Sequence, residues 1–246
     1  MIELAAGAWR AALRPGVGGC LAVLDRAGVP VLRTMGEDAD HPLQSACFAL
    51  VPYCNRIAEG RFAFAGRAVS LTPNLPPQRH PLHGLGWLQP WRVVRGDSAS
   101  ALLEHAHDGA DEWPWAYLAH QHVALDESGC TIRLMVQNRA DEPAPMGLGL
   151  HPYFRRAPET TVTFAAAAML GIDAGFLPDG TRHPADMFAP WSSGATLPDT
   201  LVDHCFTRWS GSAAIADALN RVPDAMTVLP PGGGACIALR IEASTA

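Results

Sequence analysis

Turn-forming residues interrupt this chain at short intervals, and their spacing limits the folds that are open to it. The 246 residues include 23 glycines and 21 prolines, spread throughout, with short β-like runs between them. Helical periodicity is nearly absent, and the helix candidates are two short segments, residues 5–13 and 213–222. Many short strands separated by turn signals are typical of an all-β sandwich or barrel. We therefore predict an all-β fold, a large antiparallel β-sandwich, and we treat residues 1–246 as one domain because a single sandwich can reach this length.

Four segments carry the strongest strand signals. The segments "GCLAVLDRAGVPVLR" (19–33) and "GRFAFAGRAVSL" (60–71) each read as strand, turn, strand. The clearest hairpin is "AYLAHQHVALDESGCTIRLMVQNRA" (116–140), with two alternating runs around "DESG". A further strand is predicted at "TVTFAAAAML" (161–170). The proline-rich stretch "PNLPPQRHP" (73–81) is short enough to be an ordered loop.

Charge and composition exclude several classes of partner. The formal net charge is −6 and the 18 basic residues are scattered, so no basic run is available for nucleic acid or an anionic membrane. The start of the chain has no secretory-signal pattern, and no run of 18 apolar residues predicts a membrane span. The six cysteines include no C-x-x-C pair, which favours free thiols over a disulfide framework. We therefore predict a cytoplasmic protein that binds a small molecule, with neither nucleic acid nor membrane as a partner.

Polar side chains that could carry chemistry gather in four segments, at residues 51–62, 79–91, 148–154 and 201–211. These segments contain Asn55, Arg56, His80, His83, His151, Asp203 and His204. Each residue also has a structural interpretation, because an arginine can cover apolar surface, a loop histidine can be a structural donor and an aspartate can cap a turn. Proline at 152 restricts the preceding residue to extended backbone, so we expect His151 to be held out from a strand end.

The remaining histidines raise the question of a metal site. Because side chains alternate along a strand, His105 and His107 share one face of their predicted strand, and so do His120 and His122. Neither pair has a well-spaced carboxylate or cysteine partner, and "EHAHD" (104–108) is typical of an exposed strand. We therefore predict no metal.

Taken in order, the polar motifs resemble the aldose 1-epimerase (galactose mutarotase) family. The similarity covers roughly residues 47–211 and is most specific at "NRIAEGRFAFAGRAVSLTPN" (55–74), "HPLHGLGW" (80–87) and "LHPYF" (150–154). The resemblance implies a galactose mutarotase-like supersandwich that interconverts the α and β anomers of free aldoses. It implies no cofactor, since ring opening and closure involve no redox step.

The same resemblance implies roles for five residues. Anomer exchange needs a base that removes the proton of the anomeric hydroxyl and an acid that protonates the ring oxygen. His151 would be the acid, since an imidazole with an ordinary pKa near ~6.5 can give and take a proton at neutral pH. His83 would be a second catalytic histidine near the ring oxygen. Asn55, Arg56 and Asp203 would bind the sugar hydroxyls.

The sequence departs from the family pattern at the general base, a glutamate in a late strand resembling C-[IV]-E-P. The tail "MTVLPPGGGACIALRIEASTA" (226–246) contains no such motif. Either Ala238 takes the place of the glutamate, or "CIALRIEAS" (236–244) is the preceding strand, which we favour for its alternation. The second alternative makes Glu242 an ordinary strand residue and implies a C-terminally truncated sandwich. Loss of the base would cost ~10²–10⁴-fold in rate, and an unpaired strand edge would favour a homodimer.

Other functions on the same scaffold stay open. The missing glutamate makes a non-catalytic carbohydrate-binding protein an alternative to the isomerase. A polysaccharide lyase or glycosidase ranks last, because a glycosidase needs two facing carboxylates that the motifs do not supply. A related branch acts on hexose 6-phosphates and would need extra basic residues at the rim, for which Arg79 and Arg155 are candidates.

Overall fold

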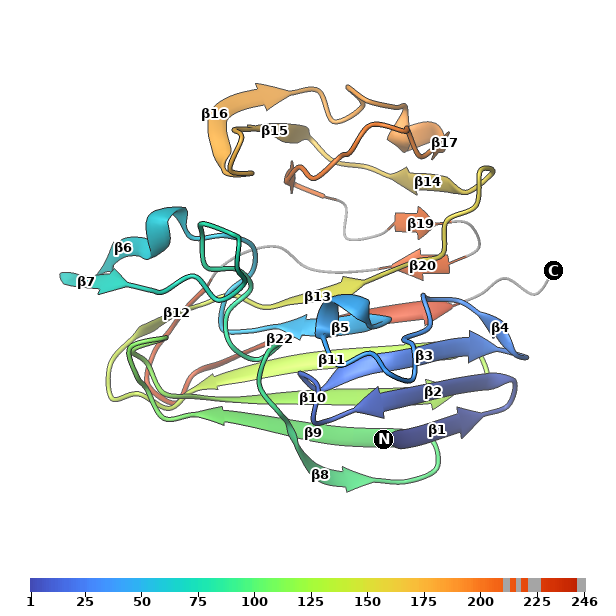
Figure 1. The fold of residues 1–246 in the computed structure, drawn as a ribbon, viewed down its shortest axis with the longest axis horizontal. Coiled ribbons are helices and arrows are strands. Elements are labelled where there is room, and N and C mark those ends of the chain that lie inside the picture. The colour runs from blue at the N-terminus through green and yellow to red at the C-terminus, as the bar shows by residue number, and fades with distance from the viewer. Residues whose placement is uncertain (210–212, 216–217, 221–226, 243–246) are drawn as a thin grey trace.

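A large β-sandwich forms the lower part of the molecule in Figure 1. The computed structural model describes residues 1–209, 213–215, 218–220 and 227–242. In the first sheet the strand order is β1-β2-β3-β5-β13, with β4 paired to β3, and the pairings are antiparallel. The bounds of these strands are Ile2–Ala6 (β1), Trp9–Arg14 (β2), Cys20–Arg26 (β3), Val29–Pro30 (β4), Cys47–Leu50 (β5) and Gly149–Pro152 (β13).

The second sheet of the sandwich has the order β22-β11-β10-β9-β8. Its strands are Arg92–Gly96 (β8), Ser100–His107 (β9), Tyr117–Asp126 (β10), Gly129–Asn138 (β11) and Gly234–Glu242 (β22). The β10–β11 hairpin is in register from Tyr117 opposite Asn138 to Asp126 opposite Gly129. Buried and half-buried residues alternate along β10, as expected for a strand with one face on the core.

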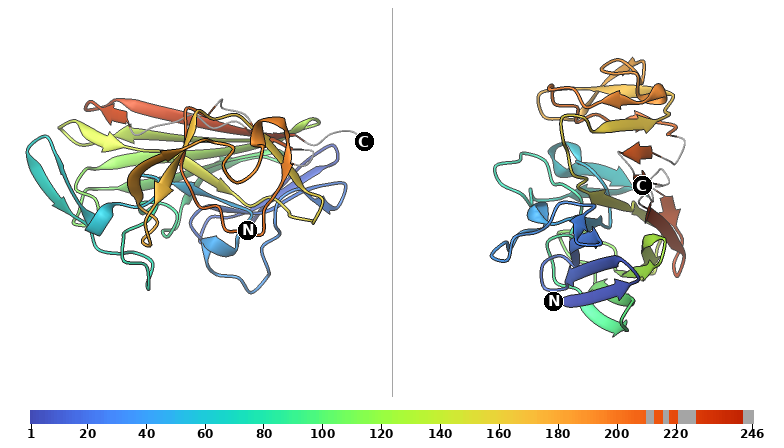
Figure 2. Two further views of the ribbon diagram at one scale, coloured as in Figure 1. Left: turned by 90° about the horizontal axis from the view of Figure 1, so that it is seen from above. Right: turned by 90° about the vertical axis from the view of Figure 1, so that its right-hand side faces the viewer.

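Above the sandwich lie two further sheets, with orders β17-β14-β19-β20 and β16-β15-β18. We call residues 161–209 the upper lobe, which Figure 2 shows stacked over the sandwich. The strands of the two sheets are Thr161–Phe164 (β14), Ala168–Ile172 (β15), Pro178–His183 (β16), Ala195–Thr196 (β17), Phe206–Thr207 (β18), Ala213–Ile215 (β19) and Ala218–Asn220 (β20).

Short elements complete the described structure. Two small antiparallel pairs join Arg61–Phe64 (β6) to Arg67–Ser70 (β7) and Ala144–Met146 (β12) to Thr227–Leu229 (β21). The helices in the described part of the chain are single 3₁₀ turns at Pro42–Gln44 (η1), Ala58–Gly60 (η2) and Trp191–Ser193 (η3). None of the described helices is long and apolar enough to cross a membrane.

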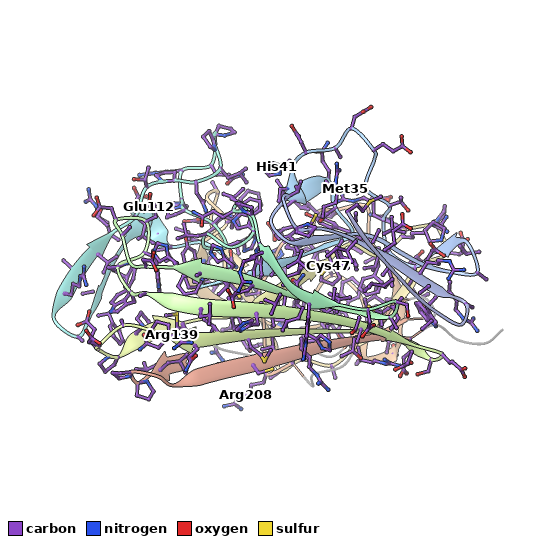
Figure 3. All side chains as sticks on the ribbon, turned by 90° about the horizontal axis from the view of Figure 1, so that it is seen from below. Met35, His41, Cys47, Glu112, Arg139 and Arg208 are labelled. Carbon is purple, nitrogen blue, oxygen red and sulfur yellow. The ribbon has the colours of Figure 1, made fainter. Side chains whose placement is uncertain are left out.

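The main core lies between the two sheets of the sandwich, where apolar side chains such as Leu13 and Leu103 pack together. The strand β5 is buried along its whole length. Cys47 and Ala49 belong to the main core, and Figure 3 shows Cys47 within the packed interior. Phe48 and Leu50 belong to a second cluster. Because side chains alternate along a strand, this second cluster lies on the opposite face of the sheet, together with Met35 and Trp87.

The predicted all-β fold and the three predicted hairpins are confirmed. Neither of the two helix candidates is a helix in its described residues. Residues 5–13 form the turn and flanking strands of the β1–β2 hairpin, in which Gly7 takes a φ of +54° that ends helical geometry. Within 213–222 the described residues form β19 and β20, and residues 216–217 and 221–222 lie outside the description.

The strand predicted at 161–170 is two strands. The segment breaks after Phe164, and β14 and β15 belong to different sheets. The alanine run between them gives no periodic signal at which a boundary could be recognised.

Candidate functional site

Aromatic rings on the outer face of the first sheet hold His151 in place. His151 lies in β13 opposite Phe48 of β5. The two rings stack with centroids 4.8 Å apart and planes 9° apart, and the ring of Tyr153 lies beside His151 at 4.7 Å. Phe48 also stacks on Trp87, at 5.4 Å. The extended backbone expected before Pro152 is therefore part of a strand, and the imidazole rests against an aromatic wall.

A second histidine is brought to this wall by a loop. The backbone N–H of His83 donates to the carbonyl oxygen of Asn55 at 2.9 Å, and Nδ1 of His83 accepts from the backbone N–H of Asn55 at 3.0 Å. Both residues have positive φ, 62° and 60°. The next residue, Gly84, has a φ of +74°, and a Cβ there would lie 2.4 Å from the carbonyl oxygen of Val51. The loop sets the ring centroids of His83 and His151 5.7 Å apart.

The Asn55–Arg56 pair joins the sandwich to the upper lobe. Oδ1 of Asn55 accepts from the backbone N–H of Arg56 at 2.8 Å and from its Nη1 at 3.3 Å. Nη2 of Arg56 lies 3.8 Å from Oδ2 of Asp203, and the Nδ2 amide of Asn55 donates to Sγ of Cys205 at 3.2 Å. The side chain of Arg56 is 12% exposed and that of Asp203 is 52% exposed. The site therefore has a mostly covered arginine facing a more exposed carboxylate.

The protonation state of His83 follows from its surroundings. Burial, and after it the charges of protonated His151 and of Arg56, lower the pKa of His83 to about 3. The ring is therefore neutral at physiological pH. Because Nδ1 accepts from the backbone N–H of Asn55, the single ring proton is on Nε2. His83 can donate this proton in a hydrogen bond to a ligand oxygen.

The pKa of His151 depends on its burial and on charged groups on both sides of the ring. Burial lowers the pKa of His151. The interaction of the ring with its own backbone and, after it, the carboxylate of Asp203 oppose that shift, and the guanidinium of Arg33 adds to it. The guanidinium carbon of Arg33 lies 3.7 Å from the centroid of the Tyr153 ring, and its Nε donates to the carbonyl oxygen of Ser45 at 3.0 Å. A fixed positive charge therefore lies behind the aromatic wall.

Two buried polar atoms at the site have no hydrogen-bond partner. They are Nδ1 of His151 and Nε of Arg56. Unpartnered buried polar atoms are uncommon in folded proteins and call for an explanation. A polar ligand bound between these two residues would supply one.

The structure brings five sequence-predicted residues together, namely Asn55, Arg56, His83, His151 and Asp203. His80 and His204 have other neighbours. Nδ1 of His80 accepts from the backbone N–H of Glu59 at 3.0 Å, and the ring of His204 packs on Phe188 with centroids 5.1 Å apart.

The two arginines considered for a phosphate lie in different places. Arg79 pairs with Glu59, with Nη2 at 3.0 Å from Oε2. Arg155 lines a cavity of about 420 Å³ together with Arg33 and Arg156, next to the end of β13. The two arginines therefore do not form one basic rim.

The segment "CIALRIE" (236–242) lies in β22, a strand position that both C-terminal alignments allow. Its isoleucines and leucine are buried in the main core, so Ala238 and Glu242 point to the outer face. Glu242 contacts Nε of Arg240 at 3.2 Å. Neither residue faces His151, because His151 is on the outer face of the other sheet.

The surroundings of the histidines in β9 and β10 differ from the expectation that they lie on an exposed strand. His105 is buried, with Nε2 at 3.0 Å from the hydroxyl of Tyr117. His120 does have a carboxylate partner, Glu104 at 3.0 Å, which the neighbouring strand supplies. Among the described residues no group of three or more histidine, cysteine or acidic side chains is placed to hold a metal ion. The six cysteines are free.

Three residues near the site were not predicted from the sequence. Phe48 stacks on His151, Cys205 accepts from Asn55, and the ring centroid of Phe176 lies 4.9 Å from the guanidinium carbon of Arg56. The position of Phe48 depends on the register of β5 against β13, which links residues about 100 apart in the chain. Phe176 sits in a turn, "DAGFLP" (173–178), that carries no motif.

Comparison with known sequences points to one family. The family profile of aldose 1-epimerase matches residues 1–229. An uncharacterised Escherichia coli K12 protein, YphB, is 30% identical over 214 residues, which cover 87% of this chain and 72% of YphB. A second uncharacterised protein of the same organism, YihR, is 24% identical over 210 residues, covering 83% of this chain and 68% of YihR.

Solved structures share the fold. A candidate aldose 1-epimerase from Escherichia coli K12 superposes with a TM-score of 0.86 at 24% identity, covering 98% of each chain. A GalM/aldose epimerase homologue from C. elegans has a TM-score of 0.80 at 18% identity, covering 99% of this chain and 98% of the other. A galactose mutarotase-like protein from Clostridium acetobutylicum has a TM-score of 0.77 at 17% identity, covering 99% and 95%. These likenesses confirm the predicted galactose mutarotase-like supersandwich.

Proposed function

Because this chain belongs to the aldose 1-epimerase family, we propose that it binds a free aldose in the site around His151 and interconverts its α and β anomers. The observation that supports the proposal is the convergence of two histidine rings, with centroids 5.7 Å apart, on a mostly covered arginine and a carboxylate that are 3.8 Å apart. A pyranose offers several hydroxyls and one ring oxygen, so this mixture of donors and acceptors matches it.

In the proposed reaction His151 protonates the ring oxygen while a solvent water molecule accepts the proton of the anomeric hydroxyl. The bond between the ring oxygen and the anomeric carbon breaks, and an open-chain aldehyde forms. Rotation about the bond next to the aldehyde, followed by the reverse steps, closes the ring in the other anomer. On ring closure the former ring hydroxyl returns its proton to His151 and the water returns its proton to the anomeric oxygen, so the complete cycle consumes no co-reactant.

The neighbouring residues hold the sugar for this proton transfer. His83, neutral with its proton on Nε2, donates to a sugar oxygen and keeps a second positive charge away from His151. Arg56 donates to hydroxyls from a guanidinium that Asn55 orients. Asp203 accepts from a hydroxyl on the upper-lobe side of the sugar. Positioning of this kind lowers the barrier because the reacting atoms are brought together in advance.

A carbohydrate-binding protein without catalysis is the second candidate. The carboxylate of Asp203 is the described acidic group whose charge raises the pKa of His151, and it already faces Arg56. Ala238 and Glu242 lie on the outer face of β22. An acceptor for the anomeric proton is therefore not evident among the described residues, whereas the groups that would bind a sugar are.

Exchange spectroscopy separates the two candidates. The rate of exchange between the anomeric proton signals of galactose and of glucose is measured by NMR with the wild-type protein and with His151→Gln. Exchange that increases with wild-type protein concentration and is lost in the variant supports the isomerase. Line broadening of the sugar signals without faster exchange supports the binding protein, and the absence of both effects contradicts both candidates.

A further inference from the structure

A turn of the upper lobe places an aromatic ring against Arg56. Phe176 lies between β15 and β16, and the guanidinium carbon of Arg56 is 4.9 Å from the centroid of its ring. An arginine at this distance from an aromatic face is attracted by the negative charge of the ring's π-cloud, more strongly where water is excluded. Arg56 is such a case, because its side chain is only 12% exposed.

The backbone of Phe176 is in a conformation that bulky residues adopt rarely. Its φ is +61°, in the left-handed region that glycine and asparagine adopt more readily than a bulky side chain. Residues held in this region are concentrated at functional sites. The two other residues of this kind at the site, Asn55 and His83, have the same backbone sign. The turn therefore keeps a phenylalanine where a smaller residue would be less strained.

Hydrogen bonds within the turn hold this strained conformation. Oδ1 of Asp173 accepts from the backbone N–H groups of Gly175 and Leu177, at 2.7 and 3.0 Å, and the N–H of Phe176 donates to the carbonyl oxygen of Asp173 at 3.0 Å. Gly175 rests close to the sandwich, since a Cβ at this position would lie 3.1 Å from Nε2 of His80. The turn is therefore fixed both internally and against the sandwich.

We infer that Phe176 is a positioning residue for the substrate-binding Arg56. The guanidinium carbon lies over the ring of Phe176, Oδ1 of Asn55 accepts from Nη1, and Asp203 lies near Nη2. These three contacts restrict the movement of the guanidinium, so that its N–H groups are held in place for a sugar hydroxyl. The inference rests on the proposed function, because it assumes that Arg56 binds the sugar, and it assigns part of the sugar affinity to a residue with no polar atom in its side chain.

The test compares Phe176→Leu, which removes the ring, with Phe176→Tyr, which keeps it. We expect Phe176→Leu to raise KM for galactose by about threefold to thirtyfold, the range that a cation–π contact corresponds to, with kcat within twofold of wild type. We expect Phe176→Tyr to keep the wild-type KM, because the aromatic ring is still present. The matched control is Phe164→Leu, because Phe164 packs on Trp191 and Phe206 in the same lobe and not on Arg56. An equal KM for the wild type and Phe176→Leu, or an equal rise in the control, overturns the inference.

A second measurement does not depend on catalysis. The Nε–H signal of Arg56, assigned by NMR in the sugar-free protein, carries a ring-current shift from Phe176 that Phe176→Leu removes and Phe176→Tyr keeps. If the wild-type protein exchanges no anomers, the proposed function fails as catalysis, and the dissociation constant for galactose takes the place of KM in the same comparison. An unchanged Arg56 signal in Phe176→Leu overturns the inference whatever the activity.

Discussion

The residues on the two sides of the site are carried by different kinds of structure. His151 is supplied by a six-stranded sheet of the sandwich, and its ring stacks on the fully buried Phe48. Asp203 precedes β18, a strand of two residues in a three-stranded sheet of the upper lobe, and its side chain is 52% exposed. Short strands in small sheets are less stable on their own than long strands over a core.

This difference suggests a division of labour between the two sides. Proton transfer needs a dry and rigid setting, since burial strengthens electrostatic interactions and shifts pKa values. Recognition of hydroxyls tolerates water and small movements. We therefore expect changes on the sandwich side to affect kcat and changes on the upper-lobe side to affect KM.

The largest expected effect is at His151. Replacement by glutamine keeps the size of the side chain but removes the transferable proton, so kcat for anomer exchange falls by ~10²–10⁴-fold. The measurement is saturation kinetics by NMR exchange, with His183→Gln in the upper lobe as the control. A wild-type kcat in His151→Gln would show that His151 does not transfer the proton. It would also contradict the expectation that the sandwich side determines kcat.

The next largest effect is at Asp203. The change Asp203→Asn keeps the shape and removes the charge that faces Arg56 and a sugar hydroxyl. A hydrogen bond to a charged group is worth about 1.5–3 kcal/mol, so KM rises roughly tenfold to a hundredfold, with a much smaller change in kcat. The same saturation kinetics give both constants. A fall in kcat comparable to that of His151→Gln would instead indicate that Asp203 takes part in proton transfer.

Low pH is expected to decrease the stability of the folded protein through His83, on the sandwich side of the site. The pKa of His83 is lowered to about 3 in the folded protein, mainly by burial, and the unfolded chain has the ordinary value near 6.5. The unfolded state therefore binds more protons between these two values, and the free energy of unfolding falls as pH decreases through that window. The loss is at most about 1.4 kcal/mol per pH unit for this histidine. Urea unfolding at several pH values measures it, and His83→Gln should show a shallower dependence.

The smallest expected effect is a change in the titration of His151. Removing the guanidinium with Arg33→Met raises the pKa of His151, because Arg33 disfavours the protonated ring. Removing the carboxylate with Asp203→Asn lowers it, because Asp203 favours that form. Ring-proton shifts followed by NMR against pH give the midpoint directly. Shifts of the same sign in the two variants would contradict the arrangement of charges around His151.

Much of the fold could be predicted from local sequence. In the β10–β11 hairpin, apolar and polar residues alternate without interruption on both sides of a recognisable turn. This alternation extends over the whole length of the hairpin. The β1–β2 hairpin was misread as a helix because its alanines favour helix and its turn is only two residues long. Tertiary pairing across the sheet overrode that local preference.

The candidate site was only partly predictable, for a geometric reason. Motifs in one family order pointed to Arg56, His83, His151 and Asp203, but nothing local indicates which rings touch them. The stack of Phe48 on His151 needs the register of β5 against β13. The contact of Phe176 with Arg56 needs the placement of the upper lobe over the sandwich. Contacts of this kind exist only once the chain has folded.

The double burial of β5 also restricts how this protein can change over evolutionary time. Ala49 points to the main core and Phe48 to the wall behind His151, and the two are adjacent in the same strand. A larger residue at 49 would push the strand outward and move Phe48, and with it the imidazole of His151. Substitutions that affect the stability of the core therefore also affect the geometry of the candidate site, and we expect them to be tolerated mainly as compensating pairs across the strand.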